Sequence, residues 1–91
     1  MDVKEKILKI MALCLEINPP EIPCIGQKKT AVFFEWMPHC NHLAIYGYLS
    51  GWKKRTERDF KFEVWTDREP KKLDKVIKFL EGTLKGEKKG D

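Results

Sequence analysis

The spacing of the hydrophobic residues changes twice along this chain, and this change constrains the fold more than any other feature. Near the N-terminus, apolar residues recur every three or four positions, which is the period of one helix face. They are Val3, Ile7, Ile10, Cys14 and Ile17. We therefore predict a helix over 2–17 that ends before Pro19-Pro20, because the residue before a proline is pushed out of the helical region.

The same N-terminal segment carries additional apolar side chains beside this face. Leu8, Met11 and Leu15 widen it. A helix with so broad an apolar side needs more than one neighbour to bury it, so we expect several elements to cover this helix.

In the middle of the chain the spacing changes to alternation, which is typical of half-buried strands. We predict strands over 30–37, 42–49 and 59–66, with a hairpin loop at 38–41. Alternation assigns one face of each strand to the core. These core-facing residues are Val32, Phe34 and Trp36, then Leu43, Ile45 and Leu49, then Phe60, Phe62 and Val64.

After the strands, the helical spacing returns at Leu73, Val76, Ile77, Leu80 and Leu84. We predict a helix over 68–84, capped by the residue at position 66 or 67, and a disordered tail over 85–91. A chain of 91 residues is the size of one domain. The fold class is therefore α+β: a two-layer α/β sandwich over 1–84 in α-β-β-β-α order, in which both helices cover one face of a three-stranded antiparallel meander.

The sheet face opposite the helices is the first candidate for function. It displays Phe33, Glu35, Tyr46, Tyr48, Lys61, Glu63 and Trp65. Exposed apolar patches commonly mark protein contacts, and we take Phe33, Tyr46, Tyr48 and Trp65 as the contact residues for an unknown protein partner or a homodimer. Two alternatives remain, because aromatic side chains on an open sheet can stack nucleic-acid bases or simply pair across strands.

Basic residues form the second candidate. The formal charge is +4, and this excess lies within residues 51–91, since the acids and lysines of 1–50 cancel. One basic group precedes the third strand and another lies on the exposed side of the last helix, and together they could hold a phosphate backbone. They are Lys53, Lys54, Arg55 and Arg58, and Lys71, Lys75 and Lys78. A nucleic-acid-binding protein is therefore the alternative function.

Two resemblances accompany these patterns. The element order, with Lys71-Lys72-x-x-Lys75 opening the final helix, resembles the double-stranded-RNA-binding domain, and this resemblance implies lysines that grip phosphates across the major groove. The segment Val32-Phe33-Phe34-Glu35-Trp36, followed by Pro38-His39 and a strand ending in Gly51-Trp52, is similar to the central hairpin of short uncharacterised proteins of phages and prophages of Gram-positive bacteria. That similarity implies a phage or prophage origin and no known activity.

The remaining chemistry-bearing residues favour a cytoplasmic protein that is not an enzyme. An odd number of cysteines without a C-x-x-C pair argues against a disulfide framework. His39, Cys40 and His42 with Cys24 offer zinc donors, but adjacent donors on a tight turn point apart, and nothing orients Cys40 as a nucleophile. We therefore predict no metal, no cofactor and no catalytic residue, and we predict no membrane span.

Overall fold

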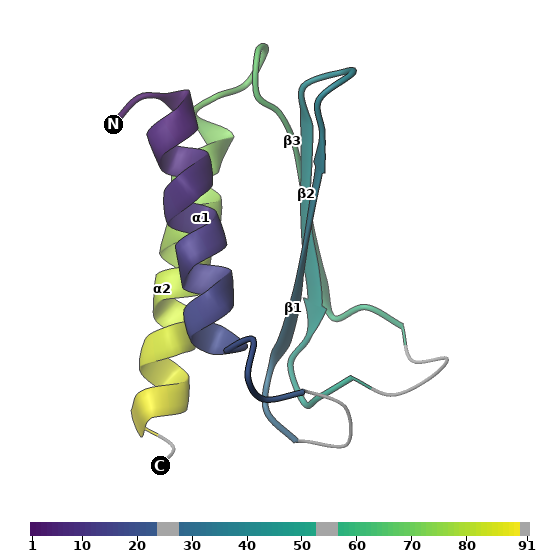
Figure 1. The fold of residues 1–91 in the computed structure, drawn as a ribbon, viewed down its shortest axis with the longest axis vertical. Helices are drawn as coiled ribbons and strands as arrows, with labels where there is room; N and C mark the ends of the chain where they lie inside the picture. Colours follow the sequence, from purple (N-terminus) through teal and green to yellow (C-terminus); the bar gives the residue numbers. More distant parts are fainter. Residues whose placement is uncertain (24–27, 53–56, 90–91) are drawn as a thin grey trace.

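Both helices lie on one side of an antiparallel sheet, as the sequence predicted (Figure 1). The structure is a computed structural model that describes residues 1–23, 28–52 and 57–89. Among these residues the sheet has three strands in the order β1-β2-β3, so β2 is central. The elements are α1 (Val3–Ile17), β1 (Ala31–Met37), β2 (His42–Tyr48), β3 (Phe60–Trp65) and α2 (Lys72–Lys89).

The register of the sheet confirms the predicted division into two faces for the paired residues, but Leu49, which was predicted to face the core, follows β2 and is 51% exposed. Phe34 lies opposite Ile45, which lies opposite Phe62, and all three pack toward the helices. One residue further along each strand, the side chains point to the other side. We call that side the outer face; its members are Phe33, Glu35, Met37, His42, Ala44, Tyr46, Tyr48, Lys61, Glu63 and Trp65.

Helix α1 begins at a capping box and ends where the prolines follow. The backbone N–H of Glu5 donates to Oδ1 of Asp2 at 2.8 Å, and the Glu5 side chain accepts from the Asp2 backbone in return. This reciprocal pair satisfies two donors that an unprotected helix start would leave free. The helix stops at Ile17, immediately before Asn18 and Pro19.

The apolar side of α1 is only partly covered. Its residues Ile10, Leu13, Cys14 and Ile17 are buried, and they join side chains of the sheet and of α2 in one core. Two neighbours, α2 and the sheet, thus cover α1 as predicted, but the three residues that widen its apolar face remain partly exposed. Leu8, Met11 and Leu15 are 52%, 39% and 50% exposed.

Helix α2 begins later and ends later than predicted. The residue before a proline disfavours the helical region, so Glu69 and Pro70 keep residues 66–71 in consecutive turns, and α2 starts at Lys72. The expected cap at Thr66 or Asp67 is therefore wrong. At the other end, the helix continues to Lys89 through part of the segment predicted to be a disordered tail.

One side chain occupies the start of the free edge of β1. The Asn18 amide donates from Nδ2 to the Thr30 carbonyl at 2.9 Å, and its Oδ1 accepts the Val32 backbone N–H at 2.7 Å. These are the contacts that a neighbouring strand would make at that place. Asn18 thus ends α1 and also closes the beginning of the sheet edge.

The opposite end of the sheet is fastened at the β1–β2 hairpin. Asn41 has φ 52°, a left-handed conformation that asparagine tolerates better than most residues. Its carbonyl accepts both the backbone N–H and the hydroxyl of Thr66, at 2.8 and 3.1 Å. The hairpin therefore fixes the chain where it leaves β3.

Cys14 supplies a pH-dependent contribution to stability. Burial raises the pKa of its thiol from 9.0 to about 11, because the ionised form loses its hydration in the core. Between these pH values the unfolded chain has released this proton and the folded chain has not, so stability falls as the pH rises. Chemical denaturation should show that wild type loses roughly 2 kcal/mol more than Cys14→Ala between pH 9 and 11. Parallel stability curves for the two proteins would contradict this assignment.

Candidate protein-contact face

The centre of the outer face is an aromatic cluster that also holds charged groups. The Phe33 and Tyr46 rings are stacked with centroids 5.1 Å apart and planes inclined by 6°. Tyr48 meets Phe33 edge-on, with centroids 5.9 Å apart. The guanidinium of Arg58 lies 3.9 Å from the centroid of the Tyr46 ring, which is cation–π geometry.

Tyr46 is also held through its hydroxyl, which donates to Oε1 of Glu35 at 2.8 Å. Partial desolvation and this hydrogen bond to a carboxylate raise the pKa of Tyr46, with Arg58 opposing the shift. Tyr46 therefore stays a neutral donor, in contact with an acid and a base from neighbouring segments. This arrangement fixes the ring before any partner binds.

A second cluster lies at the hairpin end of the outer face, around Trp65. The Trp65 ring lies over His42, with centroids 4.4 Å apart, and it leaves His42 only 7% exposed. Glu63 is 3.7 Å from His42 Nε2 and 3.3 Å from Lys61 Nζ. Arg68 approaches the Trp65 ring at 5.8 Å.

The four residues predicted to contact a partner all lie on the outer face, but not all are accessible. Trp65 is 38% exposed, while Phe33 and Tyr46 are half-buried. Tyr48 is 8% exposed and acts as support for its neighbours. Within the described residues, neither helix covers the outer face (Figure 1).

Sequence reasoning missed the roles of three side chains on or beside this face. Arg58 and Arg68 each lie against an aromatic ring, and His42 lies beneath Trp65. For His42 the signal lies in the strand register, because His42 is directly opposite Trp65 in the β2–β3 pairing, whereas Arg58 and Arg68 lie outside the strands. That register cannot be read from single-strand alternation.

The described basic residues do not form one surface. Arg58 lies against Tyr46 on the outer face, whereas Lys75 and Lys78 belong to α2 and Lys71 to the turn before it. The sheet separates the two groups. The other residues of the predicted basic loop, Lys53, Lys54 and Arg55, lie outside the described residues.

The candidate zinc donors are also separated. His39 is exposed in the hairpin, His42 is buried under Trp65, and the Cys40 thiol is 3.9 Å from the Met37 carbonyl oxygen. Cys24 lies outside the described residues. In the part of the chain that is described, no three histidine, cysteine or acidic side chains are grouped as a metal site requires.

Two further observations bear on the nature of the protein. Over the ranges that the structure describes, no helix has the length and apolar character needed to cross a membrane. Comparison of the chain with protein-family models, with curated proteins and with solved structures found no match in any of the three searches.

Proposed function

We propose that this protein is a non-enzymatic binding module that contacts a partner protein, or a second copy of itself, through the outer face of its sheet. The exposed Trp65 ring, on the side of the sheet away from both helices, is the observation that carries this proposal. The resemblance of the β1–β2 segment to the hairpin of phage and prophage proteins supports a phage or prophage origin. The odd number of cysteines, with Cys14 and Cys40 free, supports a cytoplasmic location.

The composition of the outer face supports a protein partner. Tryptophan, tyrosine and arginine contribute most of the binding energy in protein interfaces, because each combines a large contact area with a polar group. Tyr46 with Arg58 and Trp65 with Arg68 are two such pairs. The stack on Phe33 and the hydrogen bond to Glu35 hold Tyr46 in place, which lowers the entropy lost on binding.

A protein fits this face better than a nucleic acid does. Glu35 and Glu63 are exposed among the aromatic rings and would repel phosphates. The lysines of α2, which could neutralise a phosphate backbone, lie on the other side of the sheet from Arg58. Binding of nucleic acid is therefore the alternative that the measurement with duplex RNA tests.

Replacing Trp65 with alanine should weaken partner binding or self-association by roughly thirtyfold, the usual effect of truncating an interface tryptophan. Trp36→Ala is the matched control, because Trp36 is 37% exposed but faces the helical side. Mass measurement by size-exclusion chromatography, with and without duplex RNA, and pull-down with both variants provide the readouts. Circular dichroism verifies that the variants are folded.

Equal effects of the two tryptophan variants would contradict the proposal, and so would wild-type protein that shows neither self-association nor a captured partner. An RNA-dependent increase in mass that falls steeply with salt would instead support the nucleic-acid function.

A further inference from the structure

The free edge of β3 offers a second binding position, distinct from the outer face. Within the described residues β3 pairs only with β2. The Thr66 N–H bonds to the Asn41 carbonyl across this pair, and hydrogen-bonded residues alternate along an antiparallel strand. By this alternation the backbone N–H and C=O groups of Lys61 and Glu63 point away from β2. They are available to another strand.

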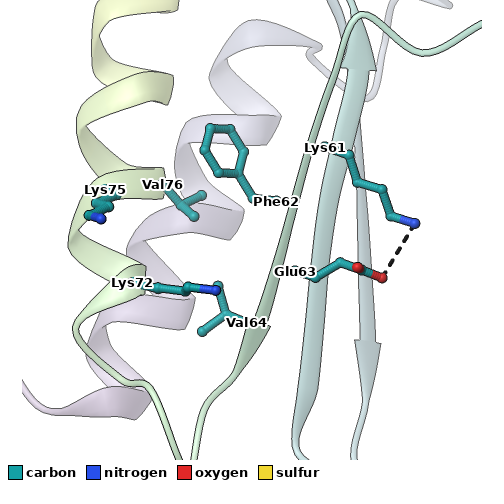
Figure 2. A pocket seen from close by; sticks show the side chains of 7 residues that line it. All are labelled: Lys61, Phe62, Glu63, Val64, Lys72, Lys75 and Val76. Carbon is teal, nitrogen blue, oxygen red and sulfur yellow. Dashed lines mark ion pairs between the residues drawn. The ribbon is translucent and has the colours of Figure 1, made fainter.

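This edge differs from the edge of β1. There the Asn18 side chain already takes the Val32 N–H and the Thr30 carbonyl. Lys61 and Glu63 direct their side chains to the outer face and pair with each other at 3.3 Å (Figure 2). Their side chains therefore leave the backbone of the β3 edge accessible.

A crevice of about 170 Å³ runs between β3 and α2 beside this edge (Figure 2). Its apolar wall consists of Phe62 and Val64 from β3 and Val76 from α2. This volume is below the roughly 300–1,000 Å³ of pockets that enclose small-molecule ligands, so it suits a single side chain. An apolar residue of an added strand that points toward α2 would enter it.

The helical rim of the crevice is positively charged. Lys72 and Lys75 line it from α2. Lys72 is 2.8 Å from Glu69, whereas Lys75 makes no ion pair among the described residues. Glu63, the acid at the crevice, carries its carboxylate on the opposite side of β3 (Figure 2). The crevice therefore favours an anionic occupant.

We propose that β3 binds an extended acidic peptide segment as a fourth strand of the sheet. Main-chain hydrogen bonds to Lys61 and Glu63 would supply affinity, as in other cases of strand addition. On the face of the added strand that points toward α2, an apolar side chain would fill the crevice, and carboxylates two residues before and after it would meet Lys72 and Lys75. The inference goes beyond the proposed function, because it uses a sheet edge and the helical side instead of the aromatic outer face.

A second copy of this chain fits the edge less well. Pairing of two β3 strands would extend one sheet with both α2 helices on it, and would bring Lys72 and Lys75 of both copies toward the same junction. Like charges at close range disfavour that pairing. The carboxylates of an acidic segment would instead be attracted by Lys72 and Lys75.

The test uses three labelled synthetic peptides and the full chain. The first repeats valine-threonine-aspartate-threonine, so that valine and aspartate share one face of the strand; the second has lysine in place of aspartate, and the third has the acidic sequence with proline in place of each threonine. Proline lacks the N–H that a strand donates, so the third peptide keeps the charge but loses strand pairing. We expect the first peptide alone to bind, and to shift the backbone amide resonances of Lys61 and Glu63.

The matched protein variants change the charge on two parts of the same helix. Lys72→Glu with Lys75→Glu should weaken binding of the acidic peptide by about tenfold, since two favourable charge contacts become unfavourable. Lys78→Glu with Lys85→Glu makes the same change in net charge outside the crevice and should leave binding nearly unchanged. Both pairs of positions are exposed, so both variants should fold.

Three results would overturn the inference: no detectable binding of the acidic peptide at millimolar concentration, equal binding of the proline-containing peptide, or equal weakening by both lysine pairs. Trp65→Ala separates the two proposals, because it should impair the outer face while leaving the Lys72/Lys75 dependence of peptide binding intact.

Discussion

Gly47→Ala is expected to destabilise the protein by about 3 kcal/mol, the upper range for overpacking a core. A Cβ atom at this position would meet the backbone carbonyl oxygen of Ala31 on β1. It would also lie 2.5 Å from Cζ and 2.8 Å from Cε1 of the Phe60 ring. A ring can turn, but a carbonyl in a paired strand moves only with the strand, so the clash must distort the β1–β2 pairing.

Urea unfolding measures this effect, with Gly82→Ala as the matched control. Gly82 lies in α2 with nothing within 4 Å of its added Cβ, so the same substitution should stabilise the protein by about 0.5–1 kcal/mol through helix propensity. The two variants should thus move the midpoint in opposite directions. A Gly47→Ala protein as stable as wild type would show that the Ala31 carbonyl lies far enough from Gly47 to admit a Cβ atom, and would contradict this close approach of β1 and β2.

Leu13→Ala should cost about 2–4 kcal/mol, because it removes a side chain from the core and leaves a cavity that the surrounding residues fill only in part. Leu13 is 4% exposed and belongs to the cluster that joins α1 to α2 and the sheet. A domain of this size loses about 4–8 °C in Tm for each kcal/mol. Thermal unfolding therefore resolves the effect easily.

Leu15→Ala is the control for this experiment, because it makes the same substitution two residues away on the same helix. Leu15 is 50% exposed, so its loss should change stability by less than about 0.5 kcal/mol. A large cost for Leu15→Ala would mean that another chain covers this side of α1 in solution. Equal losses of unfolding free energy for Leu13→Ala and Leu15→Ala would contradict the difference in exposure between these two residues.

The element order and the two sheet faces could be predicted because each depends on local spacing. Period and alternation are properties of a few consecutive residues, and they placed Phe34, Ile45 and Phe62 in the core correctly. The limits of α2 were less predictable, because Pro70 is compatible with a first helical turn and also with the turns that precede Lys72 here. The exposure of Leu8 and Leu15 depends on how many elements reach α1, which periodicity does not indicate.

The features of the candidate sites also fall into two groups: those that local spacing predicts and those that depend on how the elements pack. Alternation placed Tyr46 and Trp65 together on the outer face, but it could not show that Tyr48 is buried, since this depends on its position in the central strand and on the edge-on contact with Phe33. The crevice beside β3 was not predictable, because it requires the strand order and the placement of α2. Lys75 was predicted only as a possible phosphate contact, because its position beside Phe62 and Val64 depends on how α2 packs on β3.

The Asn18 amide has a consequence for how this protein can aggregate. A β-fibre grows when one edge of each molecule templates the other edge of the next, so it needs two compatible open edges. Here the start of β1 is occupied by a side chain of its own chain, while β3 is open. A strand that pairs with the start of β1 would therefore have to displace the Asn18 side chain, so this one residue disfavours fibre growth from that end of the edge.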